Sequence, residues 1–247
     1  MALRFAFLVL EEHPYGREML RILLEHGLVP GLVIEEVSAV ADEERGKFLT
    51  RISGQQVPPS MAELLSETAI ARQEVANHND DTCVDYLEAF GPDLVVLGGT
   101  RILRPPILAI PSLGTVNAHP GLLPWLRGSS SVAWALYKDL PIGSTTHLLD
   151  EKIDTGPIIL QRQLLVQPGD TYQQLVRRML TLSGELMAET VALFETGAVD
   201  ARPQDSKIGE TLRVIPPDLL DQAKKKLARG RYSHFASIGG TSGQDSV

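Results

Sequence analysis

Apolar runs alternate with helical patterns at the start of the chain. Residues 3–10 form an almost continuous apolar run, which is typical of a strand buried on both faces of a parallel sheet. Residues 17–26 carry apolar side chains at helical spacing, and Gly27 follows as a helix stop. A second apolar run at 32–37 completes a β-α-β unit. This unit predicts an open α/β sheet with a right-handed crossover.

The pattern continues to about residue 200. Ser60 and Glu63 have the spacing of a capping box, and the longest helical pattern begins at a cap, Asp170-Thr171, and ends before Gly197. We expect further helices at 45–52, 60–71, 80–90, 129–137, 171–196 and 218–228. We expect further strands at 74–77, 94–97, 114–119, 144–149 and 158–166, the last two as an antiparallel pair.

Composition narrows the classes of function. The hydrophobic content of 43% and charged content of 22% are ordinary for a soluble globular protein, and the net charge of -8 argues against a nucleic-acid surface. With one cysteine, Cys83, the chain forms no intrachain disulfide, and its histidines lack the spacing of metal ligands, so we expect no metal. The first apolar run is too short for a signal peptide, and no segment reaches the ~20 apolar residues of a membrane span. We expect a cytoplasmic protein.

One stretch carries candidate chemistry. Asn117 and His119 are two residues apart at the end of a predicted strand, so their side chains point to the same side. Pro120 favours an extended conformation for His119. Asp154 lies in a polar loop that glycine and proline close. An amide can steady an oxyanion, an imidazole can shuttle a proton, and a carboxylate can orient the imidazole, so the three predict an acyl-transfer site.

A longer pattern surrounds these side chains. Residues 117–124 read Asn-x-His-Pro-x-Leu-Leu-Pro, residues 127–128 are Arg-Gly, and residues 150–159 read Asp-x-x-x-Asp-x-Gly-Pro-x-Ile. This pattern resembles the folate-dependent formyltransferase family, which includes enzymes that act on glycinamide ribonucleotide, methionyl-tRNA and amino sugars. Residues 91–96 and 101–103 resemble the strand and loop that precede the family's signature.

The resemblance implies a Rossmann-like fold, an open and mostly parallel α/β sheet with flanking helices, followed here by a short C-terminal extension. We expect a formyltransferase catalytic domain at 1–200 and an extension with one helix at 201–238. The glycine- and serine-rich tail at 239–247 is expected to be disordered.

The resemblance also implies catalytic roles for Asn117, His119 and Asp154. Attack of an amine on a formyl carbon would give a tetrahedral oxyanion held by Asn117 and His119. His119 would act as the general base, and Asp154 would aid proton movement to the leaving nitrogen. For His147 two alternatives stand equal, a core histidine and a support for Asp154.

The implied formyl donor is 10-formyltetrahydrofolate, used as a co-substrate. Backbone groups would bind its pterin ring, and Ile102 and Leu103 would pack against it. The alternative is that these residues only close the edge of the sheet. The residues assigned to the folate are Arg101, Ile102, Leu103, Leu148, Leu149, Asp150 and Ile153.

The acceptor side departs from the purine-pathway members of the family. The turn at 11–16 is acidic and poor in backbone donors, which disfavours a ribonucleotide phosphate. Glu11 and Glu12 suit a cationic amine, and Arg17 is a candidate for holding an anion. Trp125 either stacks on the acceptor or packs under its loop. The residues assigned to the acceptor are His13, Tyr15, Arg17, Trp125, Arg127 and Gly128.

The leading prediction is therefore an N-formyltransferase whose acceptor is a small primary amine, an amino sugar that is free or nucleotide-linked. Only about 50 residues follow the long helix, which is short for the C-terminal barrel of tRNA-formylating members. Another small amine, glycinamide ribonucleotide and methionyl-tRNA are the alternative acceptors, and a non-catalytic folate-binding protein is the alternative of another class. A nucleotide-dependent oxidoreductase is disfavoured, because no Gly-x-Gly-x-x-Gly turn follows the first strand. We expect no nucleic-acid or membrane partner, and a homodimer is one option for the assembly.

Overall fold

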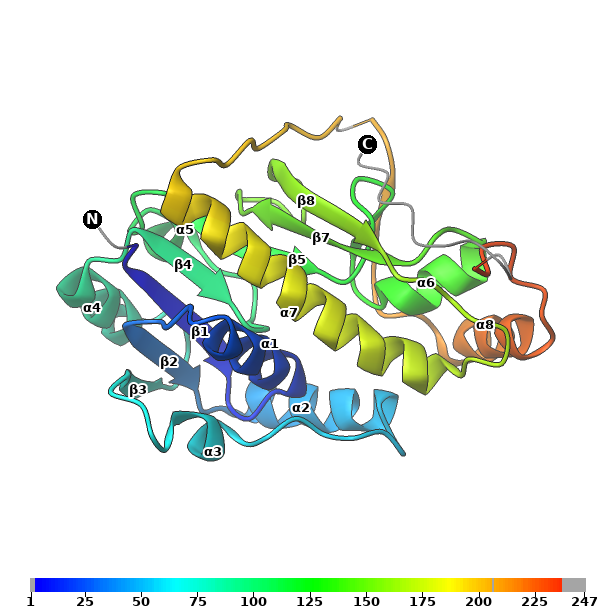
Figure 1. Cartoon of the computed structure of the whole chain (residues 1–247), viewed down its shortest axis with the longest axis horizontal. Helices are drawn as coiled ribbons and strands as arrows, with labels where there is room; N and C mark the ends of the chain where they lie inside the picture. The colour runs from blue at the N-terminus through cyan, green and yellow to red at the C-terminus, as the bar shows by residue number, and fades with distance from the viewer. Residues whose placement is uncertain (1–2, 206, 237–247) are drawn as a thin grey trace.

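The computed structural model of the chain describes residues 3–205 and 207–236. Its strands are β1 (Phe5–Leu10), β2 (Leu32–Glu36), β3 (Ala71–Val75), β4 (Leu94–Leu97), β5 (Thr115–His119), β6 (Leu126–Gly128), β7 (Gly143–Leu148), β8 (Ile158–Gln163) and β9 (Glu210–Leu212). Within the described residues, a seven-stranded sheet has the order β3-β2-β1-β4-β5-β7-β8 (Figure 1). β1 to β5 pair in parallel, whereas β7 runs antiparallel to both β5 and β8. The mostly parallel, Rossmann-like sheet is confirmed.

Helices cover both faces of this sheet. They are α1 (Pro14–Glu25), α2 (Ala39–Arg51), α3 (Met61–Leu65), α4 (Asp81–Phe90), α5 (Pro105–Leu108), α6 (Ser131–Lys138), α7 (Tyr172–Thr196) and α8 (Pro217–Ala228). α1 and α7 pack side by side on one face (Figure 1), while α4 and α5 contribute to the apolar cluster on the other.

β1 shows why both faces need cover. All six of its residues are buried. Phe7 and Val9 belong to the apolar cluster that includes α1 and α7, whereas Ala6 and Leu8 belong to the cluster that includes α4 and α5. A strand that is covered on both faces has no polar alternation, which explains the continuous apolar run in the sequence.

α7 follows its prediction closely. It begins after the Thr171 capping box and ends at a left-handed glycine cap. Two buried hydroxyl pairs tie it to β7, because Ser144 and Ser183 lie 2.8 Å apart and Thr146 and Thr190 lie 2.7 Å apart, oxygen to oxygen. All four hydroxyl-bearing side chains are buried, so the two hydrogen bonds pair polar groups within the interface between the helix and the sheet.

The predicted helix at 60–71 is wrong over its second half. The capping box of Ser60 and Glu63 is present, but α3 ends at Leu65. The chain then forms β3, an edge strand that begins at Ala71 rather than at residue 74 and whose side chains are mostly exposed. An exposed edge strand carries no apolar alternation, so its sequence pattern does not distinguish it from a polar helix.

α1 and α2 both begin earlier than the apolar pattern predicts, because each uses a polar cap. α1 begins at Pro14, and His13 Nδ1 accepts a hydrogen bond from the Tyr15 backbone N–H at 3.3 Å. α2 begins six residues before residue 45, where the Ser38 hydroxyl accepts from the Ala41 N–H at 3.2 Å. Cap residues satisfy the first N–H groups of a helix without adding to its apolar face.

The chain after α7 runs back along the molecule toward α6 (Figure 1). β9 pairs in parallel with β6, and α8 packs against α6 (Figure 1). The tail predicted as disordered, 239–247, lies outside the described residues. No helix in the described part of the chain is both long enough and apolar enough to cross a membrane.

Candidate active site

The candidate site lies at the carboxyl end of β5. The strand order reverses around β1 and β4, and in such sheets the crevice beyond the carboxyl ends of the strands at the reversal is the usual ligand site. β5 is the next strand along, and it carries Asn117 and His119. β7 lies antiparallel beside it and places His147 directly opposite Asn117. Asp154 follows β7 in the loop that leads to β8.

His119 is buried and its ring is held at both nitrogens. Its Nε2 lies 2.8 Å from the Leu126 carbonyl oxygen and 3.2 Å from the Ser131 hydroxyl, and its Nδ1 lies 3.3 Å from Asp154 Oδ2. A carbonyl oxygen only accepts, so Nε2 carries the proton and Nδ1 is the basic nitrogen of the neutral ring. Burial lowers the pKa of His119, an effect that the Asp154 carboxylate opposes and His147 reinforces.

Asp154 is the charge at the centre of the site. Its Oδ2 accepts a hydrogen bond from the Gly128 N–H at 2.7 Å, and its Oδ1 lies 3.5 Å from His147 Nε2. Burial raises its pKa, but the positive charge of His119, the contact with His147 and the hydrogen bond from the Gly128 N–H outweigh burial and hold the pKa at about 2. Asp154 therefore stays ionised and stabilises a proton on His119 Nδ1.

His147 lies against both of the other polar groups. Its Nδ1 is 2.9 Å from the Leu148 carbonyl oxygen, so Nδ1 carries the proton in the neutral ring. Its Nε2 is then free to accept from Asn117 Nδ2, which lies 3.4 Å away. This contact holds the Asn117 amide nitrogen against His147, which itself lies against Asp154. Of the two alternatives for His147, the contacts favour the supporting one.

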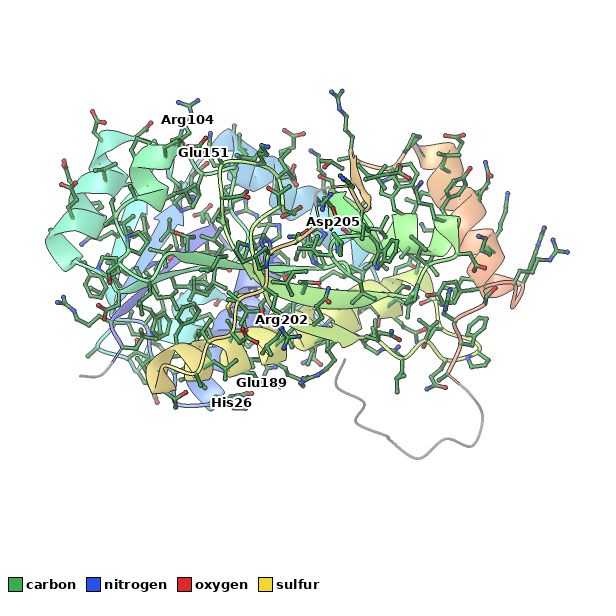
Figure 2. The ribbon with its side chains drawn as sticks, turned by 90° about the horizontal axis from the view of Figure 1, so that it is seen from above. His26, Arg104, Glu151, Glu189, Arg202 and Asp205 are labelled. Atoms are coloured by element: carbon green, nitrogen blue, oxygen red, sulfur yellow. The ribbon has the colours of Figure 1, made fainter. Side chains whose placement is uncertain are left out.

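The residues assigned to the folate lie on two segments that share an apolar floor. Buried Leu103 and half-buried Leu149 belong to one cluster, while Ile102 and Ile153 expose 71% and 44% of their surface. Arg104 and Glu151, labelled in Figure 2, lie next to these segments and appear at the same edge of the molecule.

Several polar groups of these segments already have partners within the chain. Arg101 forms an ion pair with buried Glu36, and the Ile102 carbonyl oxygen accepts from Asn79 Nδ2 at 3.0 Å. Asp150 accepts from the Lys152 N–H and the Thr155 hydroxyl, and Leu148 is half-buried. The exposed apolar side chains of Ile102 and Ile153 are therefore the groups of these two segments that can contact a ligand.

The residues assigned to the acceptor separate into two groups. His13 and Tyr15 are buried beside β5, where the Tyr15 hydroxyl donates to the Ala118 carbonyl oxygen. Burial and, to a lesser extent, the nearby Arg51 charge lower the pKa of His13 to about 4. Trp125 is exposed, whereas Arg127 is buried and Gly128 contacts Asp154.

Three charged groups of the first turn are already paired. Glu11 forms an ion pair with Arg45 at 3.1 Å, and Glu12 forms one with Arg17 at 3.3 Å. Arg17 also donates to the carbonyl oxygen of Pro59 at 2.6 Å. The expectation that these glutamates face a cationic amine, and that Arg17 is free to hold an anion, is therefore not met by this arrangement.

A pocket opens beside the site between α2, α6 and α7. It adjoins the ring of His119 through Pro120 and through Ser131, whose hydroxyl lies 3.2 Å from His119 Nε2. Arg51 is the positively charged residue that lines the pocket, and it forms no ion pair within the described residues. The remaining lining is mainly apolar or aromatic: Tyr15, Phe48, Ser130, Val132, Tyr172, Val176, Met179 and Leu180.

Residues 4–191 match the family model described as formyl transferase. The chain belongs to this family of enzymes. It is 30% identical over 186 residues to a methionyl-tRNA formyltransferase of Thermotoga sp. (strain RQ2), a match that covers 74% of the chain but 58% of that relative. The chain therefore spans less than two thirds of the length of such curated relatives.

Solved formyltransferases share the fold. Phosphoribosylglycinamide formyltransferase from Anaplasma phagocytophilum superposes with a TM-score of 0.64 at 22% identity, over 86% of this chain and 99% of that one. The formyltransferase PseJ from Anoxybacillus kamchatkensis, solved with UDP-4,6-dideoxy-4-formamido-L-AltNAc and tetrahydrofolate, gives 0.53 at 22% identity, over 84% and 85%. At these identities the likeness concerns the architecture alone.

The sequence does not predict two neighbours of the candidate catalytic residues. The Ser131 hydroxyl lies against His119, and Gln204 contacts the Asp154 loop from the C-terminal segment. Ser131 lies within a helix that the pattern predicts, but its contact depends on the fold of the intervening loop. Gln204 lies in a polar segment without periodicity, so the sequence holds no signal for it.

Proposed function

We propose that the protein transfers a formyl group from 10-formyltetrahydrofolate to a primary amine of a small acceptor. The observation that carries the proposal is the contact of His119 Nδ1 with ionised Asp154, beside Asn117, at the carboxyl edge of the sheet. The folate supplies the formyl group when it is bound. The acceptor amine forms a new C–N bond to the formyl carbon, the bond to the folate nitrogen breaks, and one proton moves from the amine to that nitrogen.

The chain's own groups fit each part of this step. The Asn117 amide donates to the developing oxyanion, and one such donor is worth about 2.7–4 kcal/mol of transition-state stabilisation. Nδ1 of neutral His119 takes the proton of the attacking amine, and Asp154 stabilises the imidazolium that results. The same nitrogen then returns the proton toward the leaving group.

The folate side of the site suits a flat, largely apolar ring. Leu103 and Leu149 give an apolar floor, and the exposed side chains of Ile102 and Ile153 stand beside it. Burying such side chains against a ring contributes roughly 25 cal/mol per Å² of apolar surface removed from water. Arg101, fixed on Glu36, supports this segment rather than offering a free charge.

For the acceptor we propose an amino sugar, free or nucleotide-linked. The aromatic side chains of the pocket suit the apolar face of a sugar ring, and Arg51 suits a phosphate or carboxylate carried by it. The solved relative with a bound UDP-linked sugar supports this choice. The curated relatives favour a second candidate, methionyl-tRNA.

Thermal stability in the presence of ligands tests the proposal. We expect 5-formyltetrahydrofolate, a stable folate analogue, to raise the melting temperature, and one member of a panel of UDP- and dTDP-linked amino sugars to raise it further. A response to formylatable methionyl-tRNA alone would favour the second candidate. The absence of any shift with saturating folate would contradict formyl transfer, and folate binding without turnover would indicate a non-catalytic folate-binding protein.

A further inference from the structure

The segment after α7 runs alongside the loop that carries Asp154. Ile158 and Arg202 exchange two backbone hydrogen bonds, each of 2.8 Å, in antiparallel register. This register brings Gln204 opposite Gly156, two residues from each member of the pair. Arg202 and Asp205, labelled in Figure 2, mark the positions on either side of Gln204 along this segment. The segment lies beyond residues 4–191, which match the family.

Both the nitrogen and the oxygen of the Gln204 side-chain amide form hydrogen bonds. Its Nε2 donates to the carbonyl oxygens of Asp154 at 3.0 Å and Gly156 at 2.7 Å. Its Oε1 accepts from Arg127 Nε at 3.3 Å and Nη2 at 3.2 Å. Because a guanidinium only donates, Arg127 fixes which end of the amide faces the loop. Arg127 is itself buried and also donates to the Ile208 carbonyl oxygen at 3.0 Å.

Asp154 needs such support. Its φ of 53° lies in the left-handed region, which is strained for a non-glycine residue and persists only where the surroundings hold it. The same C-terminal segment supports the carboxylate from a second side. β9 pairs with β6 and fixes Gly128, whose N–H donates to Asp154 Oδ2 at 2.7 Å. The extension therefore contacts the loop backbone and also positions a donor to the Asp154 carboxylate.

We propose that Gln204 is a positioning residue for the catalytic Asp154, so that the C-terminal extension completes the active site. The inference rests on the proposed function. Without the amide, the carbonyl oxygens of Asp154 and Gly156 lose their donor and the left-handed residue relaxes. The carboxylate then withdraws from His119 Nδ1, while the binding surfaces for folate and acceptor remain.

A matched pair of variants tests the inference. Gln204→Met keeps the side chain's length and removes its amide, whereas Arg202→Ala alters an exposed side chain two residues away that pairs with Asp200. The assay follows tetrahydrofolate release from 10-formyltetrahydrofolate with hydroxylamine as a stand-in acceptor. We expect Gln204→Met to lower kcat by about 10²-fold with the KM for folate unchanged, as for a small misplacement of a catalytic group. Arg202→Ala should match the unaltered protein.

The titration of His119 gives a readout that packing alone would not move. The titratable groups that face its ring are Asp154 and His147, and Asp154 raises its pKa. In ¹³C-histidine NMR, with His119→Gln used for assignment, we expect the pKa of His119 to fall in Gln204→Met and to stay constant in Arg202→Ala. An unchanged kcat and an unchanged titration in Gln204→Met would overturn the inference.

A second variant keeps the inference testable if Gln204→Met does not fold. Gln204→Glu keeps the contact with Arg127 but offers no donor to the two carbonyl oxygens, so we expect the same loss of kcat in a folded protein. Full activity of Gln204→Glu would also overturn the inference. If the unaltered protein releases no tetrahydrofolate, the proposed function fails, and the His119 titration still decides the role of Gln204.

Discussion

Replacing Asp154 by asparagine removes the carboxylate charge at the centre of the site with almost no change in size. The amide oxygen can still accept from the Gly128 N–H, which lies 2.7 Å from Oδ2. What is lost is the charge that faces His119 Nδ1 at 3.3 Å. In the proposed mechanism, the imidazolium that forms when His119 takes the amine's proton would then have no counter-charge, so the variant tests the charge rather than the packing of Asp154.

The expected size of the effect follows from this distance. At 3.3 Å and an effective dielectric constant of about 20, two unit charges attract by about 5 kcal/mol. If the proton resides on His119 in the transition state, losing this attraction slows turnover about 10³- to 10⁴-fold. The KM for the folate should change little, because the charge matters only once the proton moves.

The assay is the release of tetrahydrofolate from 10-formyltetrahydrofolate with hydroxylamine as acceptor. Glu151→Gln is the matched control, because Glu151 is an exposed carboxylate three residues earlier in the same loop (Figure 2). We expect the control to keep full activity. If Asp154→Asn turned over within about ten-fold of the unaltered protein, the charge coupling between Asp154 and His119 would be refuted.

The same carboxylate predicts a pH dependence of stability. The pKa of Asp154 falls from 3.8 to about 2 on folding, which corresponds to about 2 kcal/mol of stability. Because the folded pKa is the lower one, this stability is present above pH ~4 and is lost as the pH falls toward ~2. In urea unfolding, the gap between the unaltered protein and Asp154→Asn should narrow over this range. A gap that stays constant with pH would contradict the assignment.

Three further predictions concern residues around the site. Asn117→Ala should lower kcat about 10²- to 10³-fold without lowering the melting temperature, and Asn117→Asp at equal activity would contradict an oxyanion donor. Gly128→Ala should destabilise the fold by more than about 2 kcal/mol in urea unfolding, because φ is 86° and a Cβ would lie 2.2 Å from the Leu212 carbonyl oxygen. A double-mutant cycle of Thr146→Val and Thr190→Val should show a coupling of about 1 kcal/mol, and additive losses would rule out the buried hydrogen bond between them.

The sequence predicts the parts of the fold that depend on local pattern. The apolar run of β1, the helix after it and the capped α7 each have a periodicity or a cap that one segment contains by itself. The segments that form β3 and the start of α2 have no apolar periodicity that would predict them. β3 is an exposed edge strand, and the start of α2 depends on the single hydroxyl of Ser38 rather than on an apolar face.

The site likewise contains residues that local spacing predicts and contacts that depend on the fold. Asn117 and His119 share a strand, so their spacing alone places them on one side. The meeting of His119 with Asp154 depends on the antiparallel register of β5 and β7, which the spacing of two residues does not contain. Gln204 reaches the site only because the chain returns after α7 and pairs with Ile158. Contacts made by returning segments leave no periodic trace in the sequence.

Transfer of a labelled formyl group tests the central claim most directly. The protein is incubated with 10-formyltetrahydrofolate carrying ¹³C in the formyl group and a mixture of amino sugars and their nucleotide-linked forms, and the products are separated and analysed by mass spectrometry. We predict one labelled N-formyl product and an equal amount of tetrahydrofolate, both missing with His119→Gln. Label that stays on the folate, or that appears equally with His119→Gln, would contradict formyl transfer by Asn117, His119 and Asp154.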